Sequence, residues 1–110
     1  MISQEANKLV EKIQKEAANN GFGAGLVELL KELRPHALKE SDPLITRSIR
    51  LCYEFIESTE GFDIPLPEES EIEGEPAELF DYLCGLWLKS ENKYNRDEIR
   101  ELADEMTNSY

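Results

Sequence analysis

The sequence predicts an all-α protein, a compact bundle of about five short helices with one long acidic loop between the third and the fourth. In several stretches apolar residues recur at spacings of three and four, which places them on one face of a helix. Residues that stop or start helices separate these stretches, among them Asn20-Gly21, Asp42-Pro43 and Pro76. One stretch of 17 residues, from Thr59 to Glu75, lacks this periodicity and contains two Gly and two Pro residues.

The first two helices are expected on either side of a glycine-rich turn. The first runs from about Ser3 to Asn19, since apolar residues recur on one face from Ile2 to Ala17. The second runs from about Ala24 to Arg34. Pro35 lacks a backbone donor, so we expect it to end or kink this helix, with one or two further turns reaching Glu40.

The third helix begins at Asp42-Pro43, where Asp caps the helix and Pro occupies its first turn. Its broad apolar face continues to about Ser58, which predicts a central position in the bundle. The acidic loop follows, with a tip from Glu68 to Glu75. We expect apolar side chains to pin this loop to the core: Phe62, Ile64 or Leu66. Loops of this length are usually functional or mobile.

The last two helices complete the bundle. The fourth begins at Pro76, runs to about Lys89 and has the most apolar sequence of the five. The fifth runs to about Met106. Its start is predicted at Asn95, because Glu98 lies three residues further on and the pair resembles a capping box.

The length and composition favour a single small domain. We expect residues 1–110 to form one helical domain, because 110 residues with 40% hydrophobic content suffice for one modest core. No signal peptide and no membrane-spanning run of apolar residues is evident, so the expected location is cytoplasmic. A net charge of −12 disfavours nucleic acid and anionic membrane surfaces as partners, since both are bound through Lys and Arg.

The negative charge is concentrated in the middle third of the chain. Between Leu51 and Leu88 there are 11 acidic residues and no Lys or Arg, which gives this stretch a net charge of −11. The rest of the chain holds 13 acidic and 12 basic residues and is nearly neutral. Localised charge of one sign produces a directed field and indicates a cationic partner.

No catalytic, metal or cofactor site is predicted. His36 is the single histidine, and it is not preceded by a Glu three residues earlier, as a di-iron helix motif requires. Cys52 and Cys84 lie in apolar helical patterns, so we expect two reduced core thiols, with a disulfide between them as the disfavoured alternative. The stretch from Glu68 to Glu78 lacks the alternating Asp residues of a calcium loop. Gly21-x-Gly23 follows a helix instead of a strand, unlike a phosphate-binding loop.

The leading hypothesis is a small interaction module that binds a basic protein partner. Electrostatic steering would be followed by burial of apolar side chains from the loop and the fourth helix. Inhibitors and immunity-type proteins that cover a basic substrate cleft share this physical profile, although charge and fold alone do not establish function. The side chains expected to meet the partner are Phe62, Asp63, Ile64, Leu66, Glu68, Glu69, Glu71, Ile72, Glu73, Glu75, Glu78 and Asp81.

A structural role is the alternative. Leu86, Trp87 and Leu88 are three consecutive apolar residues, which is more than one helix face needs. They predict an oligomer seam on the fourth helix, in a helical subunit or homodimer without a charged partner. Enzymatic activity is the least expected function, because no set of nucleophile, base and orienting group can be assembled.

Overall fold

Five α-helices make up the secondary structure of residues 1–108, the part of the chain that the computed structural model describes, and this part contains no strand. The helices are α1 (Gln4–Asn20), α2 (Ala24–Lys39), α3 (Pro43–Thr59), α4 (Pro76–Leu88) and α5 (Lys93–Asn108). The prediction of an all-α bundle is therefore confirmed.

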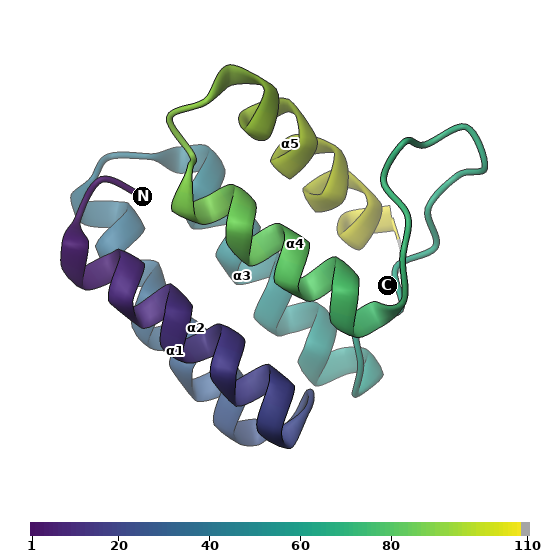
Figure 1. Ribbon diagram of the computed structural model, residues 1–110, viewed down its shortest axis with the longest axis horizontal. Helices are drawn as coiled ribbons and strands as arrows, with labels where there is room; N and C mark the ends of the chain where they lie inside the picture. Colours follow the sequence, from purple (N-terminus) through teal and green to yellow (C-terminus); the bar gives the residue numbers. More distant parts are fainter. Residues whose placement is uncertain (109–110) are drawn as a thin grey trace.

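The helices surround one buried core. Neighbouring helices pack in the order α1, α2, α3, α5, α4, and α4 packs back against α1, which closes the ring (Figure 1). Every helix contributes fully buried side chains to the core, such as Ile13, Leu30, Phe55, Trp87 and Leu102. The radius of gyration is 12.7 Å, as expected for a compact chain of this size.

The connection between α1 and α2 is as short as predicted, and α2 continues beyond Arg34 to Lys39. Gly21 has φ of 75°, in the left-handed region that glycine adopts without steric cost, and its N–H donates to Ala17 O. Pro35 lies inside α2, which continues to Lys39. The sequence left open whether Pro35 ends or kinks this helix, and the structure excludes an end at Arg34. Leu33 and Ala37 are both fully buried, so core packing holds the helix together across the proline.

The starts of α3 and α4 follow their local signals. Pro43 is the first residue of α3, and Oδ1 of Asp42 accepts a hydrogen bond from the Ile45 N–H at 3.3 Å. Pro76 is the first residue of α4. At this end Oε1 of Glu78 accepts a hydrogen bond from the Glu75 N–H at 3.2 Å.

The start of α5 differs from the prediction. Oδ1 of Asn92 accepts hydrogen bonds from the N–H groups of Tyr94 (2.8 Å) and Asn95 (3.3 Å), so Asn92 caps the helix. Asn95 lies inside the first turn, and its side chain donates to Lys89 O at 3.0 Å. The predicted capping box at Asn95 is therefore wrong, because an earlier asparagine satisfies the same donors.

Residues 60–75 connect α3 to α4 without a helix or strand. Phe62, Ile64 and Ile72 of this segment are buried in the core, and Leu66 is half-buried against it. Of the three residues predicted to pin the segment, Phe62 and Ile64 are buried, whereas Leu66 is only partly buried. In Figure 1 the segment projects from the end of the bundle where α3 stops and α4 starts.

Candidate partner-binding surface

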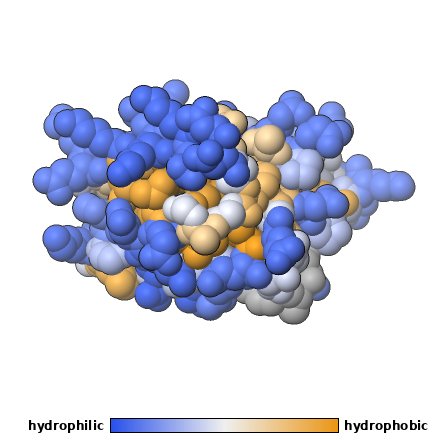
Figure 2. All heavy atoms as spheres, turned by 90° about the horizontal axis from the view of Figure 1, so that it is seen from below, coloured by the Kyte–Doolittle hydropathy of each residue, from blue (hydrophilic) through white to orange (hydrophobic). Residues whose placement is uncertain are grey.

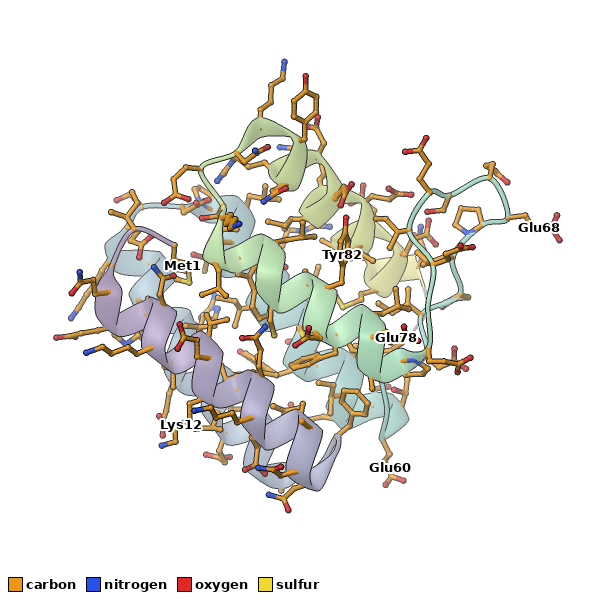
Figure 3. The ribbon with its side chains drawn as sticks, in the orientation of Figure 1. Met1, Lys12, Glu60, Glu68, Glu78 and Tyr82 are labelled. Carbon is orange, nitrogen blue, oxygen red and sulfur yellow. The ribbon has the colours of Figure 1, made fainter. Side chains whose placement is uncertain are left out.

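The apolar and acidic members of the predicted binding set face opposite ways. Phe62, Ile64 and Ile72 are at most 6% exposed and serve the core of this chain, so they cannot also be buried by a partner. The acidic members lie on the surface. With Glu60 they form what we term the acidic surface: Glu60, Asp63, Glu68, Glu69, Glu71, Glu73, Glu75, Glu78 and Asp81, all exposed. Glu60, Glu68 and Glu78 point outward around one end of the molecule (Figure 3).

Within residues 1–108, no member of the acidic surface forms an ion pair. Among residues 1–108, ion pairs involve only two of the 11 acidic residues between Leu51 and Leu88. Arg50 pairs with Glu54 at 3.1 Å, and Lys31 pairs with Glu57 at 3.5 Å. Neither residue belongs to the acidic surface. Asp81 accepts a hydrogen bond from the neutral side chain of Gln14 at 3.1 Å. The field of this surface is therefore not cancelled by local ion pairs.

Helix α5 extends the negative field beyond what the sequence suggested. Ser70 Oγ donates to Glu101 Oε1 at 2.9 Å, which links the 60–75 segment to α5. Burial, and then the negative charges of Glu101 and Glu71, raise the pKa of Glu98 above its usual value. The Tyr82 hydroxyl donates to Glu98 Oε2. Glu98 and Glu101 were missed because nothing in the local sequence predicts that α5 packs beside the segment.

A groove lined by both apolar and acidic residues opens next to the acidic surface, between the start of α2 and the end of α3. It has a volume of about 540 Å³, and it is lined by Phe22, Gly23, Ala24, Val27, Glu28, Ile56, Glu57 and Glu60. Figure 2 views the molecule from below, the side on which the α1–α2 turn and Glu60 lie, and shows an apolar patch bordered by hydrophilic side chains. The groove brings together three separate parts of the chain, so no local pattern in the sequence predicts it.

An aromatic cluster connects the groove to the 60–75 segment. The ring of Phe62 lies 5.9 Å from that of Phe22, 6.0 Å from that of Phe55 and 5.3 Å from that of Phe80, measured between centroids. Phe22 is half-buried and also meets Phe80 edge to face at 5.6 Å. Phe22, the one ring of this cluster that lines the groove, thus packs directly on the ring that anchors residues 60–75.

The apolar run of α4 is used internally. Leu86 and Trp87 are 5% and 0% exposed, and Leu88 is half-buried against the core. The Trp87 Nε1–H donates to Ser48 Oγ at 3.0 Å. This placement removes the observation that suggested an oligomer seam on the fourth helix, because the chain itself covers these side chains.

The buried thiols are not arranged for chemistry. Cys52 and Cys84 are both free and buried, as predicted, and burial raises the pKa of each thiol well above its usual value. Within residues 1–108, no three His, Cys, Asp or Glu side chains are grouped to hold a metal ion. None of the helices described is long and apolar enough to cross a membrane.

Comparison of the chain with protein-family models, with curated proteins and with solved structures gives no match.

Proposed function

We propose that this protein is an interaction module that binds a basic protein partner through the acidic surface. The observation that supports this function is the set of nine exposed carboxylates that form no ion pair with residues 1–108. Concentrating this many like charges at one end of a small domain destabilises the compact state by self-repulsion, and a cationic partner would relieve that repulsion.

The mechanism is electrostatic steering onto a preformed surface. Unopposed negative potential accelerates encounter with a cationic protein and orients it toward the charged end. The segment that bears most of these charges is anchored in the core by Phe62, Ile64 and Ile72, so little conformational entropy is lost on binding. A small acidic domain that covers a basic cleft would act as an inhibitor or immunity-type protein, and a cytoplasmic location is part of this proposal.

A charge-reversal pair tests the function. One variant changes Glu68, Glu69, Glu71 and Glu73 to Lys; a matched control changes Glu5, Glu11, Glu32 and Glu91, which are also exposed. The two variants have the same net charge and differ only in where the charges lie. Wild-type protein, immobilised at low salt, should retain a basic protein from a native cell lysate and release it as salt is raised.

The outcome depends on charge position. Retention should be lost in the segment variant and kept in the control, and association of the purified partner should slow at least tenfold in the segment variant alone. Equal loss in both variants would mean that only net charge matters. Recovery of nothing but further copies of the chain would favour the structural alternative, and light scattering at two protein concentrations would then measure the oligomeric state.

A further inference from the structure

The groove between α2 and α3 combines an apolar floor with a negative rim. Phe22, Val27 and Ile56 supply the floor, and Val27 and Ile56 remain only 5% and 2% exposed although they line an opening of about 540 Å³. Glu28, Glu57 and Glu60 line the same opening, and of these Glu57 already pairs with Lys31 at 3.5 Å. Apolar walls favour removal of an apolar group from water, and the carboxylates of Glu28 and Glu60 disfavour an anionic one.

The backbone at the rim of the groove supports a role for Glu60. This residue ends α3 in the left-handed conformation, with φ of 60° and ψ of 26°. Glycine adopts this conformation without steric cost and is the commonest residue at such helix ends. Position 60 instead holds an exposed carboxylate that lines the groove, and the glycine is one residue further on.

We propose that the groove binds one large apolar side chain, Leu or Phe, that is flanked by Lys or Arg in the basic partner. This inference rests on the proposed function and identifies the part of the partner that is buried. Charge complementarity determines the occupant: the apolar side chain fills the space beside Phe22, and the flanking cations meet Glu28 and Glu60, which form no ion pair with residues 1–108. Since charge contributes mostly rate and specificity, burial in the groove provides the affinity that the acidic surface alone lacks.

Two short peptides of equal charge provide the probe. The first has the sequence Lys-Lys-Leu-Phe-Lys-Lys and the second Lys-Lys-Gly-Ser-Lys-Lys, both with blocked ends. Methyl NMR of the full chain reports on Val27 and Ile56 in the floor of the groove, and titration gives the affinity of each peptide. The apolar peptide should bind at least tenfold more tightly and should shift these methyl signals, because a buried Leu or Phe is worth that factor or more.

Two variants change the groove, a third is their control, and all three replace exposed residues. Ala24 is exposed and lines the groove, so Ala24→Trp should fill it and abolish the preference for the apolar peptide. Ala18→Trp, at another exposed position outside the groove, is the matched control and should leave the preference intact. Glu60→Gly should weaken binding of both peptides without lowering stability, since glycine suits the backbone there.

The failures of the two proposals are distinguishable. Equal affinity for the two peptides, or an unchanged preference in Ala24→Trp, would overturn the groove assignment and leave the acidic surface as a purely electrostatic docking site. Failure of both peptides to bind at low salt would count against the proposed function as well. Methyl shifts at Val27 and Ile56 that depend on protein concentration without peptide would overturn the assignment by making a second copy the occupant.

Discussion

The Phe62 ring stacks on the ring of Phe22 with centroids 5.9 Å apart and an angle of 20° between their planes. Phe62 is fully buried in the middle of the acidic chain segment, whereas Phe22 is half-buried in the α1–α2 turn and lines the groove. This contact joins the two surfaces on which the proposed function rests. A ligand in the groove touches the same aromatic cluster that holds the acidic segment, so binding at either surface is expected to stabilise the other.

Replacement of Phe62 by Ala should therefore be among the most destabilising single changes. A fully buried Phe truncated to Ala costs about 3–5 kcal/mol, a large share of the roughly 5–15 kcal/mol by which domains of this size are stable. Urea denaturation followed by circular dichroism measures the loss. Glu68→Ala, on the exposed part of the same segment, is the control and should change stability by less than about 0.5 kcal/mol. A small loss for Phe62→Ala would contradict the anchoring function of the cluster.

Helix starts were predictable where the signal is local. Asp42-Pro43 and Pro76 each fix a helix start within two or three residues, and both are observed there. The effect of Pro35 could not be decided from the sequence, because burial of Leu33 and Ala37 outweighs the loss of one backbone hydrogen bond and only tertiary packing reveals that burial. The capping box predicted at Asn95 was wrong because Asn92, three residues earlier, fits the same capping role.

The candidate site was predictable only in its charges. The concentration of carboxylates is visible in the sequence, and so is the alternation of those carboxylates with Phe62, Ile64 and Ile72. Tertiary packing decides which side of the segment faces the core, and it buries the apolar side chains and leaves the carboxylates exposed. The groove is formed by Phe22 from the α1–α2 turn and Ile56 from α3. No spacing rule connects residues that lie so far apart in the chain.

The ion pair between Asp42 and Arg96 should make stability depend on pH. Arg96 donates to both carboxylate oxygens of Asp42, at 2.8 and 2.9 Å, and joins α5 to the start of α3. The hydrogen bonds from Arg96 are the main reason that the pKa of Asp42 lies below its usual value. A lowered carboxyl pKa stabilises the fold above the usual pKa of about 4, and this stabilisation is lost as pH falls through the folded-state value.

Replacement of Arg96 by Met should expose this pH dependence. We expect a loss of about 1–2 kcal/mol at pH 7, reduced for solvent screening because the Arg96 side chain is 33% exposed. The difference from wild type should shrink as pH falls below the usual carboxyl pKa and through the lowered folded-state pKa of Asp42. Arg100→Met, which breaks an exposed pair with Asp97, is the control and should cost less than about 0.5 kcal/mol. Urea midpoints measured from pH 2.5 to 7 make the comparison, and a loss for Arg96→Met that does not vary with pH would contradict it.

Removing only one partner of the hydrogen bond from Trp87 to Ser48 should lower the free energy of unfolding. Both residues are fully buried, and the Trp87 Nε1–H to Ser48 Oγ distance is 3.0 Å. Ser48→Ala leaves a buried N–H without an acceptor, which costs about 1–3 kcal/mol. A double-mutant cycle with Trp87→Phe isolates the pair, and the double variant should lose less stability than the sum of the two single losses. Strict additivity in urea denaturation would argue against this hydrogen bond.

The two cysteines should be inert in the folded protein. Thiolates are the reactive form, and burial raises the pKa of both Cys52 and Cys84 well above the usual value. A thiol reagent at pH 8 should modify neither residue in native protein within the time in which free cysteine reacts completely. In denaturant both should react. Rapid modification of one thiol in native protein would mean that its helix opens readily or that its side chain is exposed.

Glu98 should contribute a pH dependence of opposite sign. Burial raises the pKa of Glu98, and the negative charges of Glu101 and then Glu71 add to this effect. The folded state therefore holds the proton of the Glu98 carboxyl more tightly than the unfolded state does. The fold therefore gains stability from this group as pH falls through the folded-state pKa and loses that gain as pH rises. Glu98→Gln removes the charge, retains an acceptor for the Tyr82 hydroxyl, and should raise the melting temperature at pH 7.

That increase should disappear as pH falls through the raised folded-state pKa of Glu98 and below the usual carboxyl pKa, because the wild-type carboxyl then takes up its proton. Glu101→Gln provides the comparison at a neighbouring position on α5, since Glu101 accepts a hydrogen bond from Ser70 and its replacement weakens the contact with the 60–75 segment. Melting curves of both variants from pH 4 to 8 make the measurement. A Glu98→Gln protein that is less stable than wild type at pH 7 would show that the contact from Tyr82 to the carboxylate outweighs burial and the repulsion from Glu101 and Glu71.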